Sequence, residues 1–251
     1  MTSTFFILGD QLSLEVSPWS ELSRDTTILM IESAELIAQP RHLTRVGLYL
    51  ASMRQFADSV RALGFSVDYR TARNFTEVIA LHREEYSPES IFMNPPRGRR
   101  ARSLFAALDI SFLDEPFYLT NVEEMRSRPR RPATLENFQR EQRQRLNILM
   151  EGNEPFNDGA IPLASAEGFI RQVTGWREWV WLLHHLRDET YAESNFLGAH
   201  NDVPATWRTM TSHEMRCIEG VLNHLRNYGW NHHIERLMVL ANAATVAGID
   251  P

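Results

Sequence analysis

The sequence of 251 residues contains no lysine, so all 26 of its basic residues are arginines. A phosphate-loop NTPase needs the lysine of GxxxxGK[ST], and a Schiff-base enzyme needs a lysine amine, so both classes are excluded. No GxGxxG follows the first apolar run, which argues against a dinucleotide site of the usual kind. A hydrolase with a histidine base is also disfavoured, because no GxSxG or comparable nucleophile elbow is present.

Cysteine and long apolar runs are equally scarce. Cys217 is the single cysteine, which excludes a disulfide framework within the chain and is typical of a reducing compartment. No apolar run approaches the roughly 18 residues of a membrane span, and Phe5–Leu8 is too short for a signal core. We therefore expect a cytoplasmic protein that does not enter a membrane.

The formal net charge of −6 argues against a uniformly basic, nucleic-acid-binding surface, but the charge is unevenly distributed. Residues 126–145 hold seven arginines against two glutamates, first in a proline-rich loop and then in a helical pattern over 135–150. A second basic stretch follows the turn at 94–96. Either stretch could contact a phosphate backbone, or could simply be solvated surface.

Five short, β-rich apolar runs alternate with helical patterns over residues 4–113. The predicted strands are Thr4–Leu8, Thr27–Ile31, Phe65–Tyr69, Ser90–Met93 and Ile110–Leu113. Apolar residues at intervals of three and four predict a helix over Thr44–Leu63, ended by Gly64. This alternation predicts an α/β domain with a five-stranded, parallel, Rossmann-like sheet covered on both faces.

Parallel sheets bind ligands beyond the carboxyl ends of their strands. The loop Gly9–Leu12 and the pair Glu32–Ser33 would lie there, as a binding site or as ordinary turns. Farther along, glycine, asparagine and proline cluster at 151–162 and predict a linker. We therefore expect the α/β domain over 1–150, a linker over 151–165 and an all-helical domain over 166–251.

The helical domain should contain a helix over Ala166–Leu186, a second helix capped by Thr211 and Glu214, and a last helix starting at Gly229. In the first, an aromatic and aliphatic face lies beside charged residues; that face holds Phe169, Val173, Trp176 and Val180. The stretch GWNHHIER at 229–236 combines a tryptophan, two histidines and an arginine. Together the two segments suggest a pocket for a flat, anionic ligand.

Simpler interpretations of these residues stay open. Trp176 and Trp230 could be core, and Arg177 could pair with Glu178 or Glu167. A further set, His213, Cys217 and His224, falls on one helical face with a spacing compatible with zinc, or with a capping histidine and a buried cysteine.

The motifs FxRQxxGWRE (169–178) and GWxHHxxR (229–236), together with LGDQL at 8–12, resemble the photolyase and cryptochrome family. The resemblance is closest to the bacterial iron–sulfur (6-4) photolyases, the deoxyribodipyrimidine photolyase-related proteins. It implies an N-terminal α/β domain with a lumazine-type antenna chromophore, and a helical domain whose FAD faces UV-damaged DNA. The implied activity is light-driven electron transfer from reduced flavin to a flipped-out (6-4) photoproduct.

The resemblance also assigns roles by position. Trp176, Arg177 and Arg236 would contact the flavin or the lesion. His233 would protonate the lesion, with His232 as its catalytic neighbour. Gly9, Asp10, Gln11 and Glu32 would bind the antenna, near which Arg41 and Arg45 replace lysines of the family. Cys217 would correspond to the first of four cluster cysteines.

Compared with the family, this chain is shortened, and we expect an incomplete helical domain. One cysteine cannot hold a [4Fe–4S] cluster unaided, so we expect no iron–sulfur cluster. An incomplete domain should leave apolar surface around Trp179–Leu183 for a second copy or a partner protein. The alternative function is that of a non-catalytic remnant binding DNA, a pterin-like ligand or a partner protein.

Overall fold

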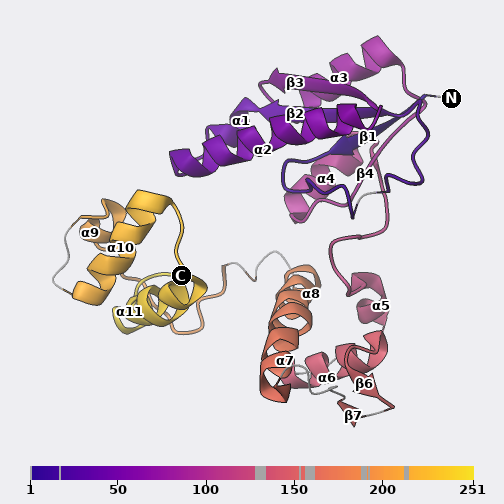
Figure 1. The fold of residues 1–251 in the computed structure, drawn as a ribbon. Helices are drawn as coiled ribbons and strands as arrows, with labels where there is room; N and C mark the ends of the chain where they lie inside the picture. Colours follow the sequence, from indigo (N-terminus) through magenta and orange to yellow (C-terminus); the bar gives the residue numbers. More distant parts are fainter. Residues whose placement is uncertain are drawn as a thin grey trace. The chain divides into compact units, whose positions relative to one another are not determined.

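Five parallel strands form one sheet in the order β3-β2-β1-β4-β5 (Figure 1). The strands are β1 Ser3–Ile7, β2 Thr27–Ser33, β3 Ser66–Ala72, β4 Ser90–Met93 and β5 Ser111–Phe112. The computed structural model describes residues 2–16, 18–127, 134–152, 154–155, 162–187, 191, 193–211 and 215–251. The predicted parallel sheet is confirmed, and each predicted run overlaps its strand.

Strand β2 is buried along its whole length, because helices cover both faces of the sheet. On one face Phe5 and Met30 pack against the helix α2, Leu43–Ala62. On the other face Phe6 packs with residues of α3 (Phe75–Tyr86) and α4 (Arg99–Ala107). Figure 1 shows α2 lying along the sheet, close to the bounds predicted for it. A short helix α1, Ala34–Ile37, follows β2.

The chain divides into two compact units, residues 115–192 and residues 1–114 with 193–251. The unit 115–192 contains α5 Val122–Ser127, α6 Leu135–Leu146, the paired short strands β6 Met150–Glu151 and β7 Glu154–Pro155, then α7 Leu163–Ile170, the π-helix η1 Arg171–Arg177 and α8 Glu178–Leu186. Its core is small, with Met125, Phe138 and Leu182 buried at the centre.

Two helix predictions in this unit have different outcomes. The helix expected over 166–186 is confirmed as one continuous helix made of α7, η1 and α8. The helix expected over 135–150 is too long, because Asn147 takes a left-handed conformation (φ 51°) and ends α6. Most of the arginine-rich loop at 126–132 lies outside the described residues. The predicted linker over 151–165 stays a prediction.

The C-terminal segment contains α9 Ala205–Arg208, α10 Arg216–Tyr228, the π-helix η3 Glu235–Ala241 and α11 Asn242–Val246. The prediction that the last helix starts at Gly229 is wrong. Gly229 has φ 64° and caps the C-terminus of α10, and helical backbone resumes only at His233. Residues 212–214 of the expected capping box lie outside the described residues. No helix in the described part of the chain is long and apolar enough to span a membrane.

Candidate functional site

The loop after β1 packs closely against α2. A Cβ atom on Gly9 would lie only 2.4 Å from the Tyr49 hydroxyl oxygen and 2.6 Å from the Met53 sulfur, so only glycine fits without rearrangement. Next in the loop, the backbone carbonyl of Asp10 accepts a hydrogen bond from Arg97 Nη2 at 2.9 Å. Gly9 and Asp10, two of the residues predicted to bind the antenna, thus have fixed positions at the carboxyl end of β1.

Gln11 connects this loop to the segment that follows β4. Its side chain is buried, and its Nε2 donates to the carbonyls of Asn94 (3.2 Å) and Pro95 (3.0 Å). The Gln11 Oε1 atom is buried and has no hydrogen-bond partner among the described residues. A buried carbonyl oxygen without a donor costs about 1–3 kcal/mol, which offsets part of what the two donated bonds contribute.

A hollow of about 180 Å³ lies beside this loop, between α1 and α2. It is lined by Ile37, Arg41, Arg45, Val46 and Tyr49. Burial raises the pKa of Tyr49, so its hydroxyl stays neutral at ordinary pH. The hollow is smaller than the usual ligand pocket of roughly 300–1,000 Å³, so it can enclose only part of a ligand. Its two arginines favour an anionic or carbonyl-rich part.

Glu32, at the carboxyl end of β2, has its oxygens occupied. Its carboxylate accepts from Arg54 Nε (2.8 Å) and Nη2 (3.0 Å), from the Tyr69 hydroxyl (2.5 Å) and from the Thr71 hydroxyl (3.3 Å). The hydrogen bond from Arg54 is the main reason that the pKa of Glu32 is lowered. Glu32 therefore joins β2 to β3 and α2, and its contact with an antenna stays a prediction.

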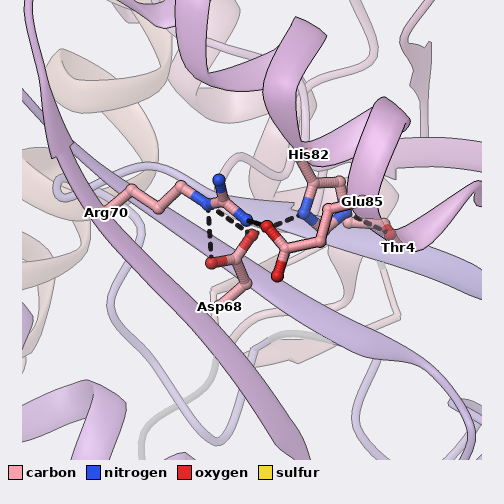
Figure 2. A network of polar contacts seen from close by, with 5 residues as sticks. All are labelled: Thr4, Asp68, Arg70, His82 and Glu85. Atoms are coloured by element: carbon pink, nitrogen blue, oxygen red, sulfur yellow. Dashed lines mark hydrogen bonds and ion pairs between the residues drawn. The ribbon is translucent and has the colours of Figure 1, made fainter.

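A second polar network is buried under α3 (Figure 2). Figure 2 shows His82 between Asp68 and Thr4, with Nδ1 2.6 Å from the Asp68 carboxylate and Nε2 2.8 Å from the Thr4 hydroxyl. Arg70 Nε binds both Asp68 oxygens at 2.8 Å, and Arg70 Nη2 reaches Glu85 at 2.6 Å. Burial alone would raise the pKa of Asp68, but the bonds from His82 and Arg70 lower it.

This order of acid, histidine and hydroxyl is that of a hydrolytic triad. However, Thr4 and His82 are both 0% exposed, so a substrate cannot reach the hydroxyl. The network instead fastens α3 to the sheet. Sequence reasoning missed it, although two signals were present: Asp68 is a carboxylate inside a predicted strand, and His82 continues the buried helical face of Val78 and Ile79.

In the unit 115–192, the motif 169–178 runs along α7 and η1. An apolar stripe lies on the exposed side of this helix: Phe169 is 71% exposed, Trp176 48% and Val180 58%. The expectation of exposed apolar surface over Trp179–Leu183 is wrong for Trp181 and Leu182, which are buried. The exposed side is the one that sequence analysis assigned to core or to a pocket wall.

The Arg177 guanidinium is already engaged. It contacts the Glu178 carboxylate at 2.6 Å, donates to the Phe117 carbonyl and lies 4.2 Å from the centre of the Tyr118 ring. Glu178 is completely buried and accepts a second bond from the Thr120 amide at 2.9 Å. The simpler interpretation, an ion pair with Glu178, is therefore confirmed. The two hydrogen bonds use two of the five N–H groups of the guanidinium, and the side chain is 43% exposed.

The remaining predicted residues lie near the C-terminus. The rings of His232 and His233 are exposed and their centroids lie 4.3 Å apart. Arg236 is also exposed. Cys217 is exposed and not in a disulfide, which corrects the suggestion of a buried cysteine. Among the described residues no group of three or more histidine, cysteine, aspartate or glutamate side chains could hold a metal ion, and His213 lies outside them.

Comparison with known proteins identifies the family to which this chain belongs. Residues 5–159 match the model of the deoxyribodipyrimidine photo-lyase-related protein family. A (6-4) photolyase of Agrobacterium fabrum is 36% identical over 106 residues, which are 42% of this chain and 21% of that protein. The match thus spans about a fifth of the relative's length. Because the family model matches more than half of the sequence, this chain belongs to the family of deoxyribodipyrimidine photo-lyase-related proteins.

Proposed function

We propose that this chain acts in light-driven repair of UV-induced (6-4) photoproducts in DNA, with an antenna chromophore bound by its α/β half. The observation that carries the proposal is the family match over residues 5–159, which includes β2 to β5 and most of β1. The Agrobacterium relative is a (6-4) photolyase, which supports the choice of lesion.

The carboxyl edge of the sheet suits an antenna of the lumazine type. Such a chromophore is a flat, carbonyl-rich ring system with a ring N–H. Arg41 and Arg45, which line the hollow, could bind its carbonyl oxygens. Since the hollow holds only about 180 Å³, part of the ligand would stay exposed.

The described residues fit FAD and an iron–sulfur cluster to different degrees. FAD, when bound, would supply the electron that opens the lesion. Trp176 offers an exposed ring for stacking and Arg236 an exposed cation, so each suits a flavin or a nucleotide. Arg177 is held by Glu178, but it is 43% exposed and has further N–H groups for a phosphate. Cys217 is one thiolate where an iron–sulfur cluster normally takes four, so these residues do not fit a cluster.

Antenna binding is tested by adding a lumazine to the purified protein and following its fluorescence. The Arg45→Glu variant should weaken binding at least tenfold, because it places a carboxylate against a carbonyl-rich ligand. Arg61→Glu is the matched control, since Arg61 lies on the same helix outside the lining of the hollow. If both variants bind lumazine with equal affinity, the hollow is not the antenna site.

Repair is tested by illuminating the protein, with reduced flavin, on a DNA duplex that carries one (6-4) lesion. His233→Ala should abolish repair and spare flavin binding, whereas His200→Ala, at an exposed histidine elsewhere in the same unit, should not. Absence of repair by the unaltered protein would contradict the proposal.

One observation favours a second candidate, a non-catalytic protein that associates with a copy of itself. The apolar stripe of Phe169, Val173, Trp176 and Val180 is exposed on one helix, and such patches promote association. Sedimentation velocity over a range of concentrations separates the two cases. A dimer that Val180→Asp dissociates, without flavin or lumazine binding, would support this second candidate.

A further inference from the structure

The helix that follows the histidine pair begins with a reciprocal capping arrangement. His232 is the last residue before the helical backbone, and its Nδ1 accepts a hydrogen bond from the Ile234 amide at 3.2 Å. In return, the Glu235 carboxylate accepts from the His232 amide at 3.2 Å. The bond to Glu235 is the return bond of a capping box, whereas His232 caps the helix through the amide of the second helical residue, in the position usually taken by serine or threonine.

Glu235 also fastens this turn to α10. Its Oε2 accepts from Asn231 Nδ2 at 3.0 Å, and its Oε1 lies 3.2 Å from His224 Nδ1. Asn231 is 3% exposed, and its amide donates a second bond to the carbonyl of Val221. The hydrogen bond from Asn231 is the main reason that the pKa of Glu235 is lowered. Glu235 thus remains a charged acceptor that orders the turn from two sides.

The two neighbouring histidines are consequently not equivalent. Because the His232 Nδ1 atom accepts a hydrogen bond, it carries no proton, and neutral His232 must hold its proton on Nε2. A proton on Nδ1 would remove the cap. The ring of His233, in contrast, makes no hydrogen bond to any of the described residues, so its two nitrogens can exchange protons with a bound ligand.

We propose that His232 is the cap of the last helix, fixed as the Nε2–H tautomer, that Glu235 is the positioning residue that fixes it, and that His232 takes no part in the proton transfer assigned above to His233. Only the last clause depends on the proposed repair function. The tautomer and the cap are properties of the protein without substrate and can be measured separately.

The tautomers are read from long-range ¹H–¹⁵N correlation spectra of the full chain with labelled imidazoles. The His232→Asn and His233→Asn variants assign the signals, since each lacks one ring. We expect His232 as a single Nε2–H tautomer and His233 as an averaged ring. Glu235→Ala should release His232 into the averaged state. A proton on His232 Nδ1, or an averaged His232 ring in the unaltered protein, would overturn the proposal.

The cap is tested by hydrogen exchange of the amides at 234–238. His232→Ala should speed their exchange about fivefold, and His232→Asn should restore the protection, because asparagine is a good N-cap. Equal exchange in both variants would contradict the cap.

Repair assays then distinguish the roles of His232 and His233. His232→Asn should retain at least a tenth of the repair rate, whereas His233→Asn should lose a hundredfold or more, the usual loss when a proton donor is removed. A hundredfold loss in His232→Asn with normal amide protection would give His232 a direct chemical role and overturn the assignment. If the unaltered protein repairs nothing, the repair function fails, while the spectra and exchange rates still decide the cap.

Discussion

Gly9 occupies a position where any side chain would collide with α2, since its Cβ would lie 2.4–2.6 Å from atoms of Tyr49 and Met53. Gly9→Ala should lower the free energy of unfolding by about 1–3 kcal/mol, because those side chains must leave their rotamers. It should also weaken lumazine binding, since Tyr49 lines the hollow. Urea denaturation measures the first effect and chromophore fluorescence the second.

Gly47 provides the matched control. It is exposed within α2, and a Cβ there would meet nothing within 4 Å. Gly47→Ala should therefore raise stability by about 0.5–1 kcal/mol through helix propensity. Equal effects of the two substitutions would show that the loop after β1 is not packed as described.

Asp68 is the acceptor on which the buried network under α3 depends. Asp68→Asn should reduce the free energy of unfolding by about 3 kcal/mol, because it leaves the Arg70 charge without its buried counter-ion. Asp58→Asn is the control: its ion pair with Arg61 is exposed and should contribute less than about 1 kcal/mol. Thermal and urea unfolding of both variants, at one pH, give the comparison.

At the residue scale, sequence reasoning succeeded where partners are neighbours and failed where they are distant. The Arg177–Glu178 pair was anticipated because the two residues are adjacent. The contact of Gly9 with Tyr49 joins residues 40 positions apart and leaves no periodic signal. Gln11 was proposed from resemblance, but its empty acceptor depends on Asn94 and Pro95, which are brought near only by the folded sheet.

Glu32 links three elements, β2, β3 and α2, and makes their packing depend on pH. Its pKa lies below the usual 4.5 in the folded protein, so the unfolded chain binds its proton first as the pH falls. The stability that Glu32 confers is complete above pH 4.5 and is lost as the pH drops through the lowered pKa.

Glu32→Gln should therefore reduce stability at neutral pH, and the difference from the unaltered protein should shrink below pH 4.5. Urea unfolding between about pH 3 and 8 provides the curve. Glu35→Gln, at the exposed ion pair with Arg73, should change stability little at any pH. A constant difference for Glu32→Gln over the whole range would contradict the linkage.

The elements themselves were largely predictable, and the errors occur where backbone conformation departs from a regular repeat. The continuous apolar run of β2 and the apolar residues of α2 at intervals of three and four predict a strand and a helix clearly. A search for a 3.6-residue period cannot distinguish the π-helix η1 from an α-helix. The sequence predicts a helix start at Gly229 because apolar spacing resumes soon after it. Its positive φ places it at the end of the preceding helix.

On the scale of the whole molecule, the two units have separate cores of unequal size. The core of the unit 115–192 centres on three buried side chains, whereas the sheet buries apolar residues on both faces. Phe138→Ala should cost about 3–5 kcal/mol, a large share of what a small core can supply. Hydrogen exchange should then rise in α6, η1 and α8 while β1, β2 and β4 stay protected. Loss of protection in the strands as well would show that the units unfold together.

The order of strands could not have been derived from the sequence, because five similar apolar runs fit several parallel arrangements. The observed order places β1, the first strand of the chain, at the centre, paired with β2 on one side and β4 on the other. During synthesis the segment Thr4–Phe6 therefore leaves the ribosome before either of its two neighbouring strands. The edge of β1 that pairs with β4 stays unpaired until Ser90–Met93 has been translated. Until then the growing chain exposes an unpaired apolar strand edge, the kind of surface that chaperones protect.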